Sequence, residues 1–255
     1  MTRPIPADWR FTLATDLDGT FLGGTDAMRK TLYDWIEARR SEVGLIFVTG
    51  RDPDFIARMC ADGVMPWPDF IVGDVGTTIA GVDGRTIAPI AELERHITDT
   101  WGDRGDHVRG VLKDAPGLVE QDTAFRHRVS YHWDPATYDP ASVTPLEEAF
   151  DILISHGCYL DVLPKGVSKG PSLLRLLDQL GIDPETVLVA GDTLNDLSMF
   201  QTGLHGAVVG ESEQGLLDAT RDLPRARHCD APGTGGILEA IRAFGLHPDV
   251  AEVPA

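Results

Sequence analysis

The sequence predicts an α/β fold in which a Rossmann-like core, built on a parallel sheet, carries an inserted α+β domain. Near both ends of the chain, short apolar runs alternate with helical patterns, which is the βαβ order of a parallel sheet. Between these ends the order changes, and strands with alternating polar and apolar residues accompany the helices. We therefore expect residues 1–83 and 164–255 to form the core and residues 84–163 to form the inserted domain.

The first part of the core begins with an apolar strand over residues 11–15, followed by a helix over 27–40. A strand over 44–50 and a helix over 54–61 repeat this unit. Residues 70–79 then predict a third strand, a turn and a return strand.

The same order returns late in the chain, with a helix over 169–180 and a strand over 186–191. A helix after residue 194, a strand over 207–209 and a helix over 237–244 follow. Both ends of the chain are therefore expected to contribute strands to one open sheet.

The inserted domain is predicted to contain helices over 91–101 and 143–156. Its strands are expected over 125–133 and 158–164, where polar and apolar residues alternate. Helices and strands that are mixed in this way indicate an α+β unit.

The composition places the chain among globular proteins, because 42% of its 255 residues are hydrophobic and 24% are charged. A formal charge of −18 would repel a phosphate backbone, so nucleic acid is not an expected partner. No apolar run approaches the roughly 20 residues that cross a bilayer, and widely spaced cysteines indicate a reducing compartment. We expect a cytoplasmic protein without a membrane segment.

Two carboxylates, Asp16 and Asp18, follow the first predicted strand. Because strand side chains alternate, both can face the crevice at the carboxyl end of the sheet, where open α/β folds bind ligands. One carboxylate can attack phosphorus while the other protonates the leaving oxygen and then activates water. A turn with an Asx cap is the alternative, whereas an EF-hand loop is excluded because Gly19 is fourth and not sixth in the segment.

A polar turn, Thr49-Gly50, ends the second predicted strand at the same edge. The Thr49 hydroxyl and a backbone N–H of the Gly50 turn could hydrogen-bond a phosphoryl oxygen. A turn without function is the alternative interpretation.

Two more carboxylates, Asp192 and Asp196, follow a later predicted strand, with Asn195 between them. Carboxylates clustered at one edge repel one another unless a cation neutralises them, and oxygen ligands favour Mg²⁺. The segment could also cap the next helix, which does not exclude a metal.

Lys169 begins the helix predicted over 169–180, where a positive charge is unfavourable to the helix dipole. A neighbouring anion would explain its position, and a solvated lysine is the alternative. A Walker A loop is excluded because its glycine and lysine spacing is absent.

Together these four segments resemble the haloacid dehalogenase-like hydrolase superfamily. Its motifs D-x-D-x-T, a Thr or Ser, a Lys, and G-D-x-x-N-D match residues 16–20, 49, 169 and 191–196. The resemblance implies that Asp16 is a nucleophile that becomes an aspartyl-phosphate. It also implies that Asp18 is the general acid and base, as in the phosphatases and phosphomutases.

The resemblance further implies a magnesium site formed by Asp16, the Asp18 carbonyl and Asp192. The implied phosphoryl ligands are Thr49, Gly50 and Lys169. The residues implied to orient the site from behind are Asn195 and Asp196.

The insertion after the third strand resembles the type IIB caps, which are α+β lids over the active site. Stretches such as DLDGTFLGG, RVSYHWDP and LDVLPKGVSKG resemble the sucrose-phosphate phosphatase group. This resemblance implies a magnesium-dependent phosphatase that acts on a small sugar or disaccharide phosphate, with sucrose 6-phosphate as the leading candidate. A phosphosugar mutase and a catalytically silent sugar-phosphate-binding protein are the alternatives.

The strand predicted over 125–133 has a polar face that includes Arg128 and His132. This face could contact the hydroxyls of a sugar, so both residues are candidates for substrate binding. A polar face turned to solvent is the alternative.

Overall fold

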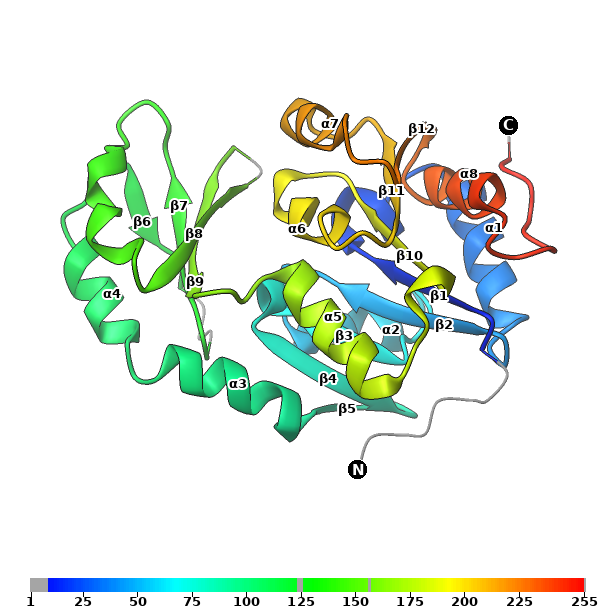
Figure 1. The fold of residues 1–255 in the computed structure, drawn as a ribbon, viewed down its shortest axis with the longest axis horizontal. Helices are drawn as coiled ribbons and strands as arrows, with labels where there is room; N and C mark the ends of the chain where they lie inside the picture. Colours follow the sequence, from blue (N-terminus) through cyan, green and yellow to red (C-terminus); the bar gives the residue numbers. More distant parts are fainter. Residues whose placement is uncertain (1–8, 123–125, 156, 255) are drawn as a thin grey trace.

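The computed structural model describes residues 9–122, 126–155 and 157–254. The strands of its larger sheet, in chain order, are β1 (Phe11–Thr15), β2 (Val43–Val48), β3 (Phe70–Gly73), β4 (Thr78–Asp83), β5 (Thr86–Pro89), β10 (Val187–Gly191), β11 (His205–Gly210) and β12 (Ala226–Pro232). They pair in the order β12-β11-β10-β1-β2-β3-β4-β5 (Figure 1). The strands from β12 to β3 are parallel, which confirms the predicted α/β core.

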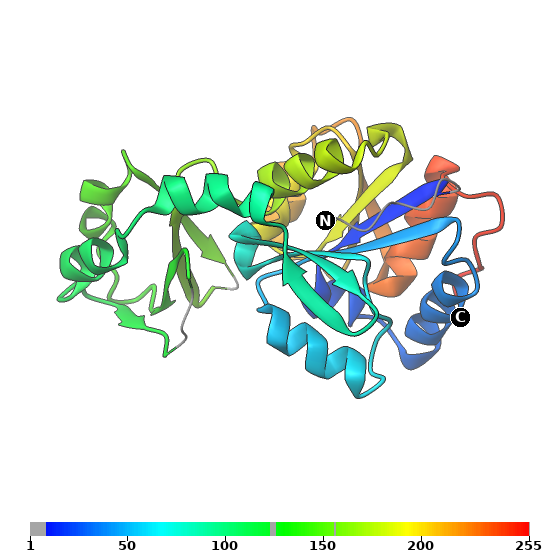
Figure 2. The same cartoon turned by 90° about the horizontal axis from the view of Figure 1, so that it is seen from below.

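Helices cover both faces of this sheet (Figure 2). One face carries α1 (Asp26–Glu37), α2 (Pro53–Ala61) and α8 (Thr234–Phe244). The other face carries α3 (Ala91–Trp101), α5 (Lys169–Leu180), α6 (Leu197–Phe200) and α7 (Gln214–Thr220). Because both faces are covered, β1, β2 and β10 are buried along their whole length, and their sequences are almost continuously apolar.

Local signals in the sequence set where the helices α1 and α2 begin. The Thr25 hydroxyl accepts a hydrogen bond from the Met28 N–H, and the Asp52 carboxylate accepts one from the Phe55 N–H. Each side chain satisfies a backbone donor that the first helical turn leaves unpaired.

A smaller antiparallel sheet lies beside the core, with the order β6-β7-β9-β8. Its strands are β6 (Leu118–Glu120), β7 (Val129–Trp133), β8 (Phe150–Ser155) and β9 (Tyr159–Pro164). Together with α3, the helix α4 (Gly105–Leu112) packs on this sheet around Trp101, Val129 and Leu160. Figure 1 shows this lobe, in green, standing at one side of the core.

The prediction of a helix over residues 143–156 is wrong. Residues 140–142 and 144–146 form short 3-10 turns, and β8 follows as an edge strand paired with β9. Phe150, Ile152 and Ile154 recur at every second position, pack on the same apolar cluster and fit the period of a strand. Phe125, the first residue of the strand predicted over 125–133, lies outside the described residues, and β7 covers only the end of that range.

The core sheet continues past the boundary predicted at residue 84. Strand β5 pairs with β4, so residues 84 and 85 form the turn of a core hairpin. We propose that the inserted domain starts after Pro89 and ends with β9, whose last residue is Pro164. Within the part of the chain that the structure describes, no helix is long and apolar enough to span a membrane.

Gly76, in the turn after β3, packs directly against the beginning of α5. Its φ is +97°, and a Cβ there would lie 2.3 Å from the carbonyl carbon of Ser168. The Ser172 hydroxyl donates to the Gly76 carbonyl over 2.7 Å. The close contact therefore fixes the helix end that carries Lys169.

We predict that Gly76→Ala lowers the free energy of unfolding by more than the roughly 1–2 kcal/mol that a positive φ costs an L-residue. Gly84→Ala is the matched control, because Gly84 has φ +60° and open space where a Cβ would stand. Urea denaturation of both variants measures the difference. Equal losses would contradict close packing between this turn and α5.

Candidate active site

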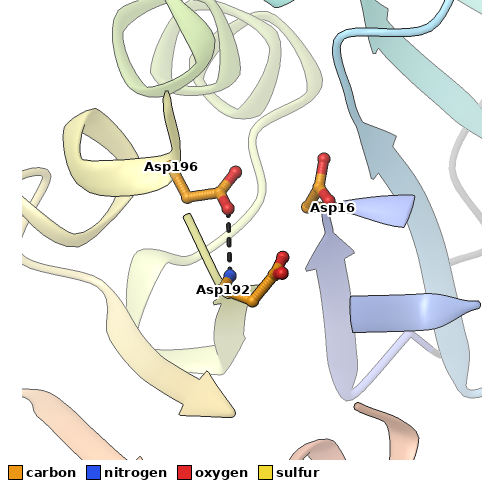
Figure 3. A group of neighbouring side chains, drawn as sticks. All are labelled: Asp16, Asp192 and Asp196. Atoms are coloured by element: carbon orange, nitrogen blue, oxygen red, sulfur yellow. Dashed lines mark hydrogen bonds between the residues drawn. The ribbon is translucent and has the colours of Figure 1, made fainter. Parts of the chain in front are cut away.

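The functional side chains come from neighbouring parallel strands. Strand β1 lies between β10 and β2, so the segments that follow these strands meet at one edge of the sheet. Asp16 follows β1, Asp192 follows β10, and Thr49 follows β2. Figure 3 shows the carboxylates of Asp16, Asp192 and Asp196 turned toward a common space.

Lys169 is fully buried among the side chains that the sequence singles out. Its Nζ donates to Asp16 Oδ1 over 2.7 Å, to Asn195 Oδ1 over 2.8 Å and to Asp196 Oδ1 over 2.6 Å. These three bonds use all the donors of an ammonium group. The alternative of a solvated lysine is therefore wrong.

Asp196 is fixed on both of its carboxylate oxygens. Oδ1 accepts from Lys169, and Oδ2 accepts from the backbone N–H groups of Asp192 and Thr193 over 3.0 and 3.1 Å. The segment thus caps the turn Leu194–Asp196, as the capping interpretation predicted, and its carboxylates also face the site. These bonds fix Asp196 between Lys169 and the backbone of Asp192 and Thr193, and its orienting role stays a prediction.

Asp192 lies beside the turn that follows Asp16. Its Oδ1 accepts from the Thr20 hydroxyl over 2.8 Å. A Cβ at Gly19, where φ is +78°, would lie 2.1 Å from Asp192 Oδ2. Only glycine fits at this position, because the carboxylate occupies the space that a side chain would need.

Oxygens of Asp16, Asp192 and Asp196 all lie within 4.8 Å of one another and mark a candidate metal centre. Because both oxygens of Asp196 already accept hydrogen bonds, Asp16 and Asp192 are the carboxylates better placed to bind a cation. Burial raises the pKa of Asp16 well above its usual value, against the opposing effect of Lys169. Burial and then the charge of Asp196 raise the pKa of Asp192 to about 7. A bound cation would offset the repulsion among these carboxylates, and an all-oxygen donor set fits a hard divalent ion such as Mg²⁺.

Lys169 stays charged in this cluster. Burial by itself would lower its pKa, but the charges of Asp16 and Asp196 outweigh burial and raise the pKa above the usual value. The site therefore holds a permanent ammonium beside Asp16.

Thr49 and Asp18 stand on the other side of Asp16, toward β2. Thr49 is fully buried, and its hydroxyl oxygen accepts from the Arg51 N–H over 3.1 Å. The hydroxyl hydrogen is left to donate to an anion. The Asp18 carboxylate receives two bonds from the Arg51 guanidinium, over 2.7 and 3.0 Å. Sequence reasoning assigned no role to Arg51, although this residue directly follows Thr49-Gly50.

Arg128 of the inserted domain contacts the core at the same edge of the sheet. Its Nη1 donates to Asp161 Oδ1 over 2.9 Å, and its Nη2 donates to the Gly50 carbonyl over 3.2 Å. Only 5% of Arg128 is exposed. Arg128 therefore joins the inserted domain to the core, and Asp161, which sequence reasoning missed, fixes it.

His132 lies farther along β7 and is exposed. Its ring stands 5.8 Å from the ring of Tyr159 on β9. A side chain that is neither buried nor bonded to the core remains free to contact a sugar, so its predicted role stays a prediction.

A family model matches most of the chain. The model of the sucrose-6F-phosphate phosphohydrolase family matches residues 9–245. The chain belongs to this family. The resemblance to sucrose-phosphate phosphatases is thereby confirmed.

The chain is also similar to three relatives with different names. The chain is 43% identical over 236 residues to a glucosylglycerol-phosphate synthase of Pseudomonas anguilliseptica, a match that covers 92% of this chain and 31% of that protein. The chain thus spans about a third of that relative's length. It is 31% identical to a mannosylfructose-phosphate phosphatase of Agrobacterium fabrum, over 92% of this chain and 97% of that protein. It is 29% identical to sucrose-phosphatase 1 of Nicotiana tabacum, over 94% of this chain and 60% of that protein.

Solved structures support the fold. The sucrose-phosphatase of Synechocystis sp. PCC6803, in complex with sucrose and phosphate, matches with a TM-score of 0.84 and 24% identity, over 93% of this chain and 98% of that chain. A haloacid dehalogenase-like hydrolase from Bacillus subtilis matches with a TM-score of 0.65 and 17% identity, over 94% and 93% of the two chains. These matches confirm the predicted fold.

The raised pKa of Asp192 predicts a pH-dependent stability. Between the usual value of 3.8 and about 7, the folded state binds more protons than the unfolded state. The contribution of Asp192 to the free energy of unfolding therefore falls as the pH rises through this window. In chelator, the melting temperature of Asp192→Asn should fall less between pH 4.5 and pH 7.5 than that of the wild type.

Added Mg²⁺ at pH 7.5 should raise the melting temperature of the wild type and leave that of Asp192→Asn nearly unchanged. Asp83→Asn, an exposed aspartate on the core hairpin, serves as control and should behave like the wild type. Identical pH and Mg²⁺ responses in the wild type and Asp192→Asn would contradict the proposed charge repulsion.

Proposed function

We propose that the protein is a magnesium-dependent phosphatase that hydrolyses the phosphate ester of a sugar or glycoside through an aspartyl-phosphate. The observation that carries this proposal is the fully buried Lys169 held against Asp16, at the sheet edge where Asp192 and Asp196 also converge and where Asp18 follows Asp16 by two residues. Binding of a sugar phosphate alone would not require a second carboxylate, Asp18, beside Asp16. The paired carboxylates Asp16 and Asp18 therefore favour catalysis over binding alone.

In the proposed first step, Asp16 attacks phosphorus with one carboxylate oxygen. An O–P bond to Asp16 forms, the P–O bond to the sugar breaks, and Asp18 gives its proton to the departing sugar oxygen. Lys169 holds Asp16 through Oδ1 over 2.7 Å, which leaves Oδ2 as the attacking atom. Alkoxides are poor leaving groups, so the proton from Asp18 is needed for departure.

In the second step, Asp18 acts as the base. It takes a proton from water, the water oxygen attacks phosphorus, and the O–P bond to Asp16 breaks. Asp16 is restored and inorganic phosphate leaves. The same two carboxylates thus complete a cycle without any further reactant than water.

The phosphoryl oxygens would be held by groups that surround Asp16. The Thr49 hydroxyl, a backbone N–H at Gly50 and the Lys169 ammonium are the proposed donors. Mg²⁺, when bound, would neutralise the charge of the transferring phosphoryl group. Asp16 and Asp192 would hold it together with the backbone carbonyl of Asp18, while Asp196 orients both carboxylates from behind.

The relatives suggest the class of substrate. Sucrose-6F-phosphate, mannosylfructose phosphate and glucosylglycerol phosphate appear in the names of the family and of two relatives. All three are phosphate esters of a glycosylated sugar or polyol. We propose that the natural substrate is such an ester, with sucrose 6-phosphate the leading candidate, and that His132 contacts its sugar part.

A phosphate-release assay with these three esters tests the function. The wild type should release inorganic phosphate from at least one of them without a bisphosphate activator, whereas a mutase would depend on one. Asp16→Asn should lose at least about 10²-fold in kcat, because the covalent nucleophile is gone, while its melting temperature stays close to that of the wild type. Asp83→Asn should keep full activity. If Asp16→Asn kept more than about one percent of the wild-type activity, the covalent mechanism would be contradicted.

The acid role of Asp18 predicts a dependence on the leaving group. Asp18→Asn should lower kcat/KM for a sugar phosphate by about 10² or more, because general acid catalysis typically contributes about 10² to 10⁴. It should change kcat/KM for 4-nitrophenyl phosphate much less, since nitrophenolate departs without a proton. The ratio kcat/KM is the right measure because it reports only the steps up to departure of the alcohol. Equal losses on both substrates would argue against the acid role.

A further inference from the structure

Arg51 makes the two-point contact with the residue proposed as the general acid. Its Nε donates to Asp18 Oδ2 over 2.7 Å, and its Nη2 donates to Asp18 Oδ1 over 3.0 Å. A planar guanidinium that grips both oxygens fixes the plane of the carboxylate as well as its position. Lysine could supply the charge but not this geometry.

The Arg51 side chain and backbone are themselves held in place. The guanidinium lies 4.6 Å from the centre of the Phe55 ring. The Arg51 N–H donates to the Thr49 hydroxyl, and the Arg51 carbonyl accepts from the Asp74 N–H over 3.1 Å. Arg51 is therefore built into the same turn that carries the proposed phosphoryl ligands.

The inserted domain contacts this turn at Gly50 and also contacts Asp74, whose N–H donates to the Arg51 carbonyl. Arg128 donates to the carbonyl of Gly50, and its guanidinium lies 3.8 Å from the carboxylate of Asp74. Asp74 and the next residue, Val75, have φ values of 52° and 59°, a backbone conformation that these residues rarely adopt. Such strain persists only where the surrounding structure enforces it, and Arg128 is part of that structure.

The ion pair between Arg51 and Asp18 contributes little to folding. The side chains are 48% and 41% exposed, and ion pairs with this much solvent access are worth little in stability. A fixed and well-oriented contact that the fold does not need indicates a role in the reaction.

We propose that Arg51 is a positioning residue that holds Asp18 for proton transfer, and that the inserted domain seats Arg51 through the contact of Arg128 with Gly50. The inference rests on the proposed function, because it concerns the acid of that reaction. Proton transfer thus becomes tied to the presence of the inserted domain over the site.

The test compares kcat/KM for a sugar phosphate and for 4-nitrophenyl phosphate in several variants. Arg51→Ala should lose about 10- to 100-fold on the sugar phosphate, a fraction of the full contribution of general acid catalysis, and less than about 3-fold on the aryl ester. Arg51→Lys should fall between Arg51→Ala and the wild type on the sugar phosphate. The melting temperature of Arg51→Ala should match that of the wild type.

Arg109→Ala is the matched control. Arg109 forms an ion pair of similar exposure with Glu120, over 2.7 Å, on the surface of the inserted domain. Removing it should alter neither substrate. Arg128→Lys keeps a charge beside Asp161 but loses the second N–H that reaches Gly50, so it should show the same dependence on the leaving group as Arg51→Ala, with a smaller loss. In the Arg51→Ala background it should add no further loss on the sugar phosphate.

The outcomes separate this inference from the proposed function. If Asp18→Asn shows no dependence on the leaving group, the acid mechanism itself fails. If Asp18→Asn depends on the leaving group, but Arg51→Ala loses kcat/KM equally on both substrates or on neither, then Arg51 does not position the acid. If Arg51→Ala depends on the leaving group and Arg128→Lys does not, the link to the inserted domain is overturned. The link is also overturned if Arg128→Lys lowers kcat/KM for the sugar phosphate as much in the Arg51→Ala background as it does alone.

Discussion

A fully buried ammonium group is the constraint on which the rest of the site depends. Removing the charge of Lys169 from water costs several kcal/mol unless partners replace the lost hydration. Its partners come from the end of β1 and from the turn Leu194–Asp196, so the start of α5 must stay in register with both. The close approach of Gly76 to Ser168 holds the same helix end from the opposite side.

The parallel sheet explains why residues far apart in the sequence can share this constraint. Strands β10, β1 and β2 are neighbours and run in the same direction, so all three deliver their following residues to one edge. Buried carboxylates of like charge accumulate there, and one permanent cation balances only part of their charge. Burial and then the charge of Asp196 raise the pKa of Asp192, and a divalent cation would offset both effects.

The inserted domain affects the core mainly through charged groups. Arg128 is buried, paired with Asp161 and bonded to the backbone at Gly50, so its role differs from the sugar contact expected of it. A second arginine, Arg126, donates to Glu94 and to Thr78 on β4. This part of the chain therefore contacts the core through Arg126 and Arg128, whereas His132 on β7 is exposed.

The sequence by itself predicted most of the core strands and helices, and the grouping of Asp16, Asp192 and Lys169 at one site, because these depend on local periodicity and on residues next to buried strands. It did not predict the strand β12 or the helix α7. The helix expected over 143–156 failed because three apolar residues at alternate positions gain their partner strand only in the folded domain. The core hairpin that continues to residue 89 depends in the same way on pairing. Only the tertiary structure decided that Arg51 meets Asp18 and that Arg128 meets Gly50, since a long side chain finds its acceptor through distances that no spacing along the chain encodes.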